Sequence, residues 1–340
     1  MRSYVRALTV VSSALAMTAG IAKAQGVADF YKGKTLTLVS GFTPNGENDI
    51  QFRLLGRHIG KYLPGNPQTV VTSMPGAGTM LAANHLVKAP ADGTVISTFT
   101  SQAGIEPFLG NSAALFDPLK LSWIGSMSQD RQFCALVGAP DGVKTFDDLR
   151  RIEVTFGSSA PSTDIFRYSV AIKNLLDARM KMVLGYAGMP GVRLALDRGE
   201  VNGVCAVSEM ILRTTLAEPL KEKKINLIIQ MGRSTTDEFG IVPSVFDFTK
   251  DQAKTEMLGF FFRDLAIGRP IAAPAGVPVE RLAALRKAVA DTLKDEVFLS
   301  EAQRIGMSVS PVPADEIQTT MESLSKKPKS FYEDVKRASE

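Results

Sequence analysis

The chain has 340 residues, of which 45% are hydrophobic and 22% charged, and its formal net charge is +4. At roughly 150 residues per domain, this length predicts two domains, each with enough apolar material for its own core. Charges of both signs are interspersed and nearly balance, which gives no electrostatic case for nucleic acid. Two cysteines are too few for a disulfide scaffold or a cysteine-rich metal site.

The first 24 residues have the features of a secretory signal peptide. Arg2 and Arg6 precede an almost wholly small or apolar run over residues 7–22, and an A-x-A cleavage site follows over residues 22–24. The apolar run is shorter than the ~20 residues that span a bilayer. We therefore expect a periplasmic protein, cleaved after Ala24, with 316 of the 340 residues and a net charge lowered from +4 to +1 by the loss of three basic residues.

Apolar segments of strand length alternate with helical periodicity along the chain, the pattern of an α/β protein with largely parallel sheets. Strands are expected over residues 35–40, 70–74, 94–99, 134–137, 154–156, 182–184, 204–207 and 225–229. Helices are expected over residues 50–63, 79–88, 145–150 and 279–293. The heavily charged tail over residues 326–340 predicts a solvated terminal helix.

Several predicted strands end in small, polar, glycine-bearing loops. Strand 35–40 runs into residues 41–49 (GFTPNGEND), strand 70–74 into residues 75–79 (PGAGT), and strand 94–99 opens into Thr100 and Ser101. Two more such loops, over residues 157–163 and 185–191, follow strands of the second predicted domain. Loops of this kind offer free main-chain N–H groups and the positive end of a helix dipole, and open sheets bind ligands at the carboxyl ends of their strands. One such loop alone is more often a tight turn, but four together predict an anion site.

Catalytic and cofactor signatures are absent from the sequence. There is no G-x-S-x-G or H-E-x-x-H motif, and the histidines His58 and His85 lie in predicted helices without ligand spacing. The segment 33–35 (GKT) precedes its strand and lacks the upstream glycine of a P-loop, and the segment 76–78 (GAG) lacks the third glycine of a dinucleotide fingerprint. We expect no catalytic residue, no cofactor and no metal.

Three features have roles that the residues alone leave open. Asp49 and Arg53 form either a surface ion pair or, with Asp49 receiving main-chain N–H groups, a support for the first loop. Tyr186 is either a core aromatic residue or a hydroxyl that faces a polar ligand. Cys134 and Cys205 are able to pair in an oxidising periplasm, but the sequence does not place them within reach, and two buried thiols are the preferred expectation.

The motifs, taken in order, resemble those of the tripartite tricarboxylate transporter receptors, also called Bug periplasmic solute-binding proteins. The resemblance spans nearly the whole mature chain, although Asn45 replaces the first glycine of the usual Pro-Gly-Gly, Asn202 stands where Asp is common, and residues 230–263 match poorly. The matching segments are 42–49 with Arg53, 75–78, 87–94, 116–118, 157–159 with Ser162, 186–188, 199–202 and 273–278.

This resemblance implies a two-lobed, type II-like Venus flytrap fold in which each lobe is a mainly parallel sheet flanked by helices. Lobe 1 would comprise residues 25–127 and 266–340 and lobe 2 residues 128–265, with hinges near residues 126–132 and 258–268. A carboxylate would be gripped by main-chain groups in the cleft between the lobes. The candidate ligand-binding residues are Thr43, Asn45, Gly46, Asn48, Asp49, Gly76, Ala77, Gly78, Thr100, Ser101, Ser158, Ser159, Ser162, Thr163, Tyr186, Ala187 and Gly188.

The leading hypothesis is a monomeric, non-catalytic receptor that captures a small organic acid and delivers it to a membrane permease. One alternative is an exported α/β enzyme acting on a carboxylate, for which Asp49, Glu209 and Asp264 are the available acidic groups. Another is a solute-binding subunit of a signalling system.

Overall fold

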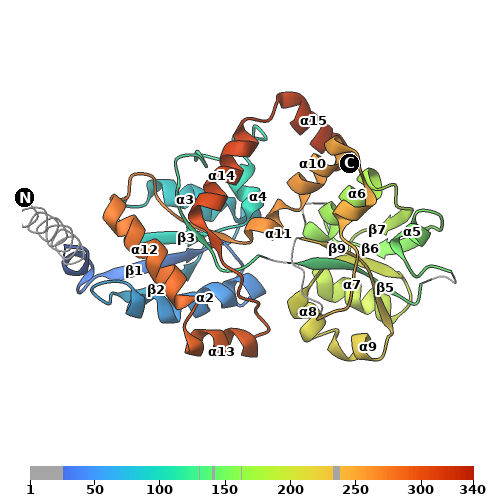
Figure 1. Ribbon diagram of the computed structural model, residues 1–340, viewed down its shortest axis with the longest axis horizontal. Helices are drawn as coiled ribbons and strands as arrows, with labels where there is room; N and C mark the ends of the chain where they lie inside the picture. The colour runs from blue at the N-terminus through green and yellow to red at the C-terminus, as the bar shows by residue number, and fades with distance from the viewer. Residues whose placement is uncertain (1–25, 130, 140–141, 162, 233–237) are drawn as a thin grey trace, which may run out of the picture. The chain divides into compact units, whose positions relative to one another are not determined.

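The computed structural model describes residues 26–129, 131–139, 142–161, 163–232 and 238–340 (Figure 1). The expected signal peptide lies outside these residues. The chain divides into two compact units. Unit 1 contains the described residues up to Ser126 together with Pro270–Ala302 and Pro313–Gln318, and unit 2 contains Met127–Arg269, Gln303–Val312 and Thr319–Glu340.

Unit 1 is built on a six-stranded sheet. Its strands are β1 (Thr35–Ser40), β2 (Gln68–Ser73), β3 (Val95–Thr98), β4 (Ser122–Ser126), β10 (Pro270–Ala273) and β11 (Val312–Pro313), in the order β11-β4-β10-β3-β1-β2. β1 pairs in parallel with β2 and β3, and β10 pairs antiparallel with β3 and β4. β1 lies between β2 and β3 and alternates Thr with Leu over its first four residues, and its Leu36 and Leu38 are fully buried on one face while Val39 is buried on the other.

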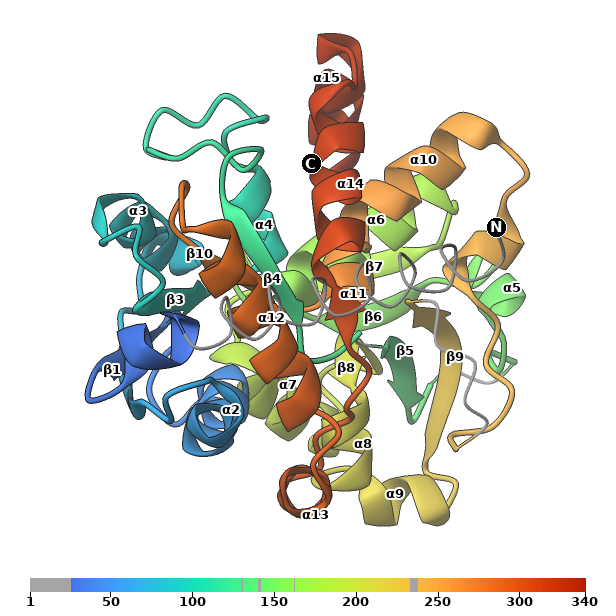
Figure 2. The same cartoon turned by 60° about the vertical axis from the view of Figure 1, so that its left-hand side comes forward.

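Helices connect and cover these strands. They are α2 (Glu47–Ile59), η1 (Gly60–Tyr62), η2 (Ala77–Thr79), α3 (Met80–Lys88), α4 (Ser101–Ile105), α12 (Val279–Thr292) and most of α13 (Glu296–Arg304). α14 (Ala314–Ser325) begins in unit 1 and passes into unit 2 after Gln318. α2 turns Phe52, Leu55 and Ile59 into the core. α12 packs on β4 and beside α2, as both ribbon views show (Figure 1 and Figure 2).

Unit 2 is built on a five-stranded sheet. Its strands are β5 (Gln132–Val137), β6 (Val154–Gly157), β7 (Met180–Val183), β8 (Gly203–Ser208) and β9 (Ile225–Met231), in the order β7-β6-β8-β5-β9. Its helices are α5 (Phe146–Leu149), α6 (Asp164–Leu175), α7 (Gly188–Asp197), α8 (Glu209–Arg213), α9 (Ala217–Lys221), η3 (Val245–Phe248), α10 (Gln252–Phe261), α11 (Arg263–Ile267) and α15 (Lys329–Ala338). None of the helices in the described ranges is long and apolar enough to cross a membrane.

The α/β class and the two helix-flanked sheets are as predicted, but the sheets are mixed. In unit 2, β7, β6 and β8 are parallel, whereas β5 runs antiparallel to both β8 and β9. In unit 1 the antiparallel strand is β10, which enters the sheet when the chain returns at Pro270. β4 (SWIGS) was missed because its two strand-forming residues, Trp123 and Ile124, stand alone between serines and a glycine, and β10 (PIAA) because it begins with proline and ends in two alanines.

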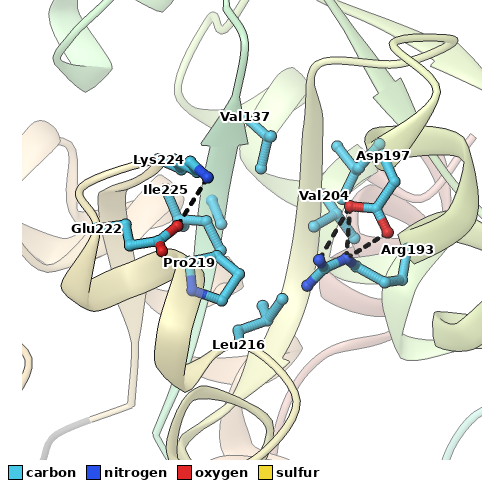
Figure 3. A pocket seen from close by; sticks show the side chains of 11 residues that line it. Val137, Arg193, Asp197, Val204, Leu216, Pro219, Glu222, Lys224 and Ile225 are labelled. Carbon is cyan, nitrogen blue, oxygen red and sulfur yellow. Dashed lines mark hydrogen bonds and ion pairs between the residues drawn. The ribbon is translucent and has the colours of Figure 1, made fainter.

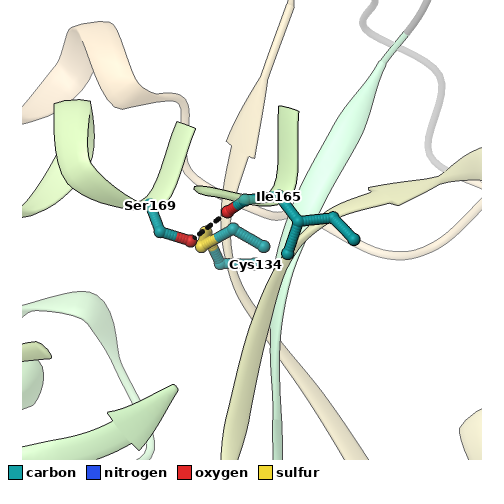
Figure 4. Close-up of a disulfide and its surroundings, with 4 residues drawn as sticks. Cys134, Ile165 and Ser169 are labelled. Atoms are coloured by element: carbon teal, nitrogen blue, oxygen red, sulfur yellow. Dashed lines mark hydrogen bonds between the residues drawn. A yellow bond between two sulfur atoms is a disulfide. The ribbon is translucent and has the colours of Figure 1, made fainter. Parts of the chain in front are cut away.

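The two cysteines form a disulfide, so the expectation of two buried thiols is wrong (Figure 4). Cys134 lies on β5 and Cys205 on β8, which are neighbouring antiparallel strands, and their Cα atoms are 3.9 Å apart. Both are buried, and Figure 4 shows Cys134 beside Ile165 and Ser169 of α6. The pairing depends on which strands are neighbours, and a single sequence does not reveal this for residues 71 positions apart.

The C-terminal tail belongs to unit 2, whereas the sequence placed all of residues 266–340 in lobe 1. α15 packs on α6, and the rings of Phe331 and Tyr332 lie 5.6 and 5.9 Å from that of Phe260. Val335 is buried as well. The tail is therefore an amphipathic docked helix, whose apolar face was hidden in the sequence by the many charges around it. The other unit borders fall after Ser126 and Arg269, against the expected 127 and 265.

Candidate ligand-binding loops

The strand order of each unit creates a topological switch point. In unit 1 the connection from β1 leads to β2 on one side, whereas β3 lies on the other side of β1. In unit 2 the connection from β6 leads to β7, whereas β8 lies on the other side of β6. Ligands of open α/β sheets bind where such connections diverge, at the carboxyl ends of the strands. The loops at the carboxyl ends of β1, β2 and β3 in unit 1 and of β6, β7 and β8 in unit 2 are therefore the candidate ligand-binding loops.

The loop after β1 contains a tight turn over residues 43–46. The N–H of Gly46 donates to the carbonyl oxygen of Thr43 at 3.0 Å, Pro44 occupies the second position of the turn, and Asn45 has a φ of 63° at the third. This is the pattern of a type II turn, which requires positive φ at its third residue and favours glycine or asparagine there. The unexpected Asn45 is thus the side chain best able to replace glycine at this position.

The side chain of Asp49 fixes the shape of this loop through hydrogen bonds. It is fully buried, and its carboxylate accepts the N–H of Asn45 at 3.0 Å, the Nε–H of Arg53 at 2.7 Å and the hydroxyl of Ser73 at 3.0 Å. Burial works against ionisation, but hydrogen bonds from Arg53, Ser40, Asn45 and Ser73 outweigh it and hold the pKa of Asp49 below its ordinary value. Of the two roles left open by the sequence, the structure therefore selects loop support.

Arg53 makes further hydrogen bonds in the same network. Beyond Asp49, it donates through Nη2 to Ser73 at 2.7 Å and through Nη1 to the carbonyl oxygen of Val71 at 3.4 Å. The ion pair thus ties the start of α2 to the end of β2, and both partners are engaged within the protein.

The loop after β2 has four consecutive residues with positive φ. The values are 141° for Gly76, 47° for Ala77, 62° for Gly78 and 74° for Thr79. Left-handed backbone is costly for alanine and more so for the β-branched threonine, and such strain gathers at functional sites. Gly76, Ala77 and Gly78 are at least partly exposed. Successive main-chain N–H groups in turns with such dihedral angles are the kind of donor that binds anions.

Thr79 joins this loop to the loop after β3. Its hydroxyl oxygen accepts the N–H of Thr100 at 2.9 Å and lies 3.1 Å from the Thr100 hydroxyl. Thr100 also caps α4, because its hydroxyl oxygen accepts the N–H of Ala103 at 3.1 Å. Ser101 is buried at the first position of α4. The candidate residues of unit 1 therefore gather at the carboxyl ends of β1, β2 and β3.

In unit 2, the loops after β6 and β7 lie side by side. The N–H of Ser158 donates to the carbonyl oxygen of Val183 at 2.8 Å, and the N–H of Tyr186 donates to that of Ser158 at 3.3 Å. The hydroxyl oxygens of Ser159 and Thr163 are 2.7 Å apart. Ser162 lies outside the described residues.

Tyr186 is half-exposed and directs its hydroxyl to a carboxylate of the same unit. It donates to Glu200 at 3.3 Å, and burial, followed by the charge and hydrogen bond of Glu200, raises the pKa of Tyr186. Ala187 and Gly188 follow at the start of α7, with the N–H of Gly188 donating to the Tyr186 carbonyl oxygen at 2.9 Å. Tyr186 is thus neither a core aromatic residue nor free of partners.

The structure adds a charged cluster at the same edge of the unit 2 sheet, of which the sequence analysis named only Glu209. Arg131 precedes β5 and donates to Glu209, the first residue of α8, at 2.8 Å and to Gln230 at 3.2 Å. Arg213 donates to the same Glu209 at 3.1 Å and to Glu238 at 2.6 Å. The only signal in the sequence was the spacing of Glu209 and Arg213 by four residues. Because two arginines face two glutamates, the cluster carries no net formal charge.

Some buried polar atoms at these strand ends have no hydrogen-bond partner within the described protein. They include Asn48 Oδ1 and Thr98 Oγ1 in unit 1, and Ser158 Oγ and Gln132 Oε1 in unit 2. A buried polar atom without a partner costs about 1–3 kcal/mol. Such atoms are the groups that a bound ligand or an ordered water would satisfy. No group of three or more His, Cys, Asp or Glu side chains within the described ranges could hold a metal ion.

The chain was compared with known proteins. No family model matches it. It is 27% identical over 171 residues to a UPF0065 protein from Cupriavidus necator, a stretch that covers 48% of this chain and 51% of that protein. The chain thus aligns with about half the length of the curated relative.

Solved structures match over nearly the whole chain. A TctC solute-binding protein from Polaromonas gives a TM-score of 0.69 at 16% identity, covering 90% of this chain and 99% of that one. The periplasmic binding protein BugD gives 0.63 at 16%, covering 91% and 98%. MatC from Rhodopseudomonas palustris with bound malate gives 0.58 at 16%, covering 90% and 99%. These matches confirm the predicted resemblance at the level of the fold: the chain has the two-unit fold of the TctC and Bug solute-binding proteins.

Proposed function

We propose that this protein is a periplasmic receptor of the tripartite tricarboxylate transporter type, which captures a small carboxylated organic acid and delivers it to a membrane permease. Three findings support the proposal. The fold is that of TctC and BugD, a solved structure of that fold holds malate, and the curated relative is a UPF0065 protein.

The observation that carries the proposal is the pair of supported loops in unit 1. The loop over residues 43–49 is held by the buried carboxylate of Asp49, and the loop over residues 76–79 is held in left-handed conformation and anchored to Thr100. The N–H groups of Asn45 and Gly46 are used within the first loop, so we infer that the donors are the main-chain N–H groups at the start of α2 and in the 76–79 segment. Each hydrogen bond from such a donor to a carboxylate contributes about 1.5–3 kcal/mol, so four or so donors suffice for micromolar binding, about −8 kcal/mol, after association costs.

We propose that the loops of unit 2 provide a second set of ligand-binding groups of the same kind. Ser158, Ser159, Thr163 and the 186–188 segment offer hydroxyl and main-chain groups, and the cluster around Arg131 borders the same sheet edge. Because the arginines of that cluster are matched by glutamates, selectivity for the acid rests on oriented donors more than on net charge.

The same contacts favour a receptor over an enzyme. Asp49 is fully buried and engaged with Arg53 and Ser73, and Glu209 is engaged with Arg131 and Arg213. A general acid or base needs a pKa near the working pH and access to the substrate. Asp49 is fully buried and so has no access to a substrate, and its pKa is lowered away from the working pH. We infer that a bound acid leaves the protein chemically unchanged.

A thermal-shift screen tests the proposal. The mature protein is heated with acetate, benzoate, malate and citrate, and with malamide as the uncharged match of malate. We expect at least one carboxylate to raise the midpoint, because a ligand at a hundredfold its Kd stabilises the folded state by ~2.7 kcal/mol. The stabilising acid should be recovered intact after prolonged incubation. A shift with malamide and none with any carboxylate would reject the proposal.

A further inference from the structure

A separate cavity, partly open to solvent, lies in unit 2 between α7 and α9 on one face of the sheet (Figure 3). Its volume is about 200 Å³. Its floor and walls include Val137 of β5, Val204 of β8, Ile225 of β9 and Leu216 before α9. Val204 and Ile225 lie at the beginning of their strands, whereas the candidate ligand loops follow the opposite ends of β6, β7 and β8. The cavity is therefore distinct from those loops.

Two ion pairs flank this apolar cavity. Figure 3 shows Arg193 and Asp197 of α7 on one side and Glu222 with Lys224 on the other. Nε of Arg193 lies 3.0 Å from each Asp197 oxygen, and Nζ of Lys224 lies 2.7 Å from Glu222. Because each cation has its own carboxylate, the cavity has no excess charge that would attract an ion.

One polar atom at the cavity lacks a partner. Nη1 of Arg193 is buried and has no hydrogen bond, while the other nitrogens of the guanidinium face Asp197. In Figure 3 the nitrogen without a dashed line lies on the side of the guanidinium turned away from Asp197, toward the cavity. A buried guanidinium N–H without an acceptor is unfavourable, and an acceptor placed there by a ligand would relieve the cost.

We propose that this cavity is a second ligand site, which takes a small uncharged molecule with an apolar body and one hydrogen-bond acceptor. The size is that of a singly substituted benzene ring, since an apolar cavity of about 150 Å³ is known to accept benzene. The acceptor is bound by Nη1 of Arg193, and the ring lies against Val204, Leu216 and Ile225. The inference does not depend on the proposed carboxylate site.

Acetophenone and α-methylstyrene form a matched pair of probes, because they differ only by a carbonyl oxygen in place of a methylene group. Binding to the full mature protein is measured by titration calorimetry and by transfer of magnetisation from ligand protons to valine, leucine and isoleucine methyl groups. We expect acetophenone to bind at least tenfold more tightly, with transfer to the methyl groups of Val204, Leu216 and Ile225. Equal affinity for the two probes, no binding of either, or transfer to other methyl groups would overturn the proposal.

Three variants test whether Arg193 binds the hydrogen-bond acceptor of the ligand. Arg193→Lys keeps a cation beside Asp197 but removes Nη1, so the preference for acetophenone should disappear while α-methylstyrene binds as before. Arg198→Lys, on an exposed side chain that does not line the cavity, should leave both affinities unchanged. Pro219→Trp, at a half-exposed wall position, should block both probes. Carboxylate binding should persist in all three variants, provided that circular dichroism shows them folded. Unaltered acetophenone binding in Arg193→Lys or in Pro219→Trp would contradict the assignment.

Discussion

At the scale of single residues, Asn45 shows how a departure from a familiar motif is explained by backbone geometry. Its φ of 63° is the left-handed conformation required at the third position of the turn over residues 43–46. An alanine in that conformation costs roughly 1–2 kcal/mol. We therefore expect Asn45→Ala to lower the free energy of unfolding in urea by about 1 kcal/mol and Asn45→Gly to change it by less than about 0.5 kcal/mol. Equal losses of unfolding free energy in the two variants would mean that the side-chain amide of Asn45, and not the conformation of the turn, stabilises the loop.

Asp49 is the residue on which the first loop most depends. Asp49→Asn removes the charge that receives the N–H of Asn45, the guanidinium of Arg53 and the hydroxyl of Ser73. Since hydrogen bonds to a charged group contribute about 1.5–3 kcal/mol each and asparagine retains some of them, we expect a loss of about 2 kcal/mol at pH 7, measured by urea unfolding. Asp334→Asn, at a more exposed ion pair of α15, should cost less than about 0.5 kcal/mol.

The stabilisation by Asp49 has a defined pH dependence. Because the pKa of Asp49 is lower in the folded than in the unfolded state, its contribution is complete above the unfolded pKa of about 4 and is lost as the pH falls through the folded pKa. The difference in unfolding free energy between the wild type and Asp49→Asn should therefore be constant from pH 7 to about pH 5 and shrink below about pH 4. A difference that grows on acidification would show that the folded pKa is raised instead.

At the scale of elements, the sequence predicted what local periodicity and turn chemistry determine. β1 was predicted with its observed bounds, and α3, α12 and the parallel strands of unit 2 within a few residues, because each has an apolar pattern bounded by Gly, Pro or Asn. The same pattern of apolar strands followed by Gly, Pro or Asn predicted the loops over residues 43–49 and 76–79. β4 and β10 were missed because their small residues form strands only through long-range pairing, and the partners of Cys134 and Arg131 depend on that pairing too.

The disulfide joins two such paired strands, and its effect on stability is measurable. Cys134 and Cys205 close a loop of about 71 residues, for which loop entropy predicts roughly 3–5 kcal/mol. The double variant Cys134→Ser/Cys205→Ser should lose about that much in the unfolding of unit 2, followed by circular dichroism in urea. Addition of a thiol reductant should lower the urea midpoint of the wild type and leave the urea midpoint of the double variant unchanged. A reductant effect on both proteins would point to a cause other than this bond.

At the scale of the whole molecule, each unit repeats one arrangement: three parallel strands with a switch point, and polar atoms at their carboxyl ends that the protein itself leaves without a partner. Thr98 supplies such an atom in unit 1 and Ser158 in unit 2. A protein selected only for stability would replace such hydroxyls by apolar groups, because a buried unpaired hydroxyl costs free energy. Their presence in both units supports the proposal that each unit contributes polar groups to the binding of a ligand or its water.

Removal of either unpaired hydroxyl should have opposite effects on stability and on ligand binding. Thr98→Val and Ser158→Ala should each leave the free energy of unfolding of the ligand-free protein unchanged or raise it by up to about 1 kcal/mol, because an unpaired hydroxyl is removed. Each should also weaken binding of the carboxylate found in the thermal-shift screen by about fivefold or more, measured by titration calorimetry, since a loss of 1 kcal/mol corresponds to about that factor. Thr255→Val, at an exposed hydroxyl that bonds within α10, serves as the control and should not change the affinity. If Ser158→Ala left the affinity unchanged, a part for the unit 2 loops in ligand binding would be contradicted.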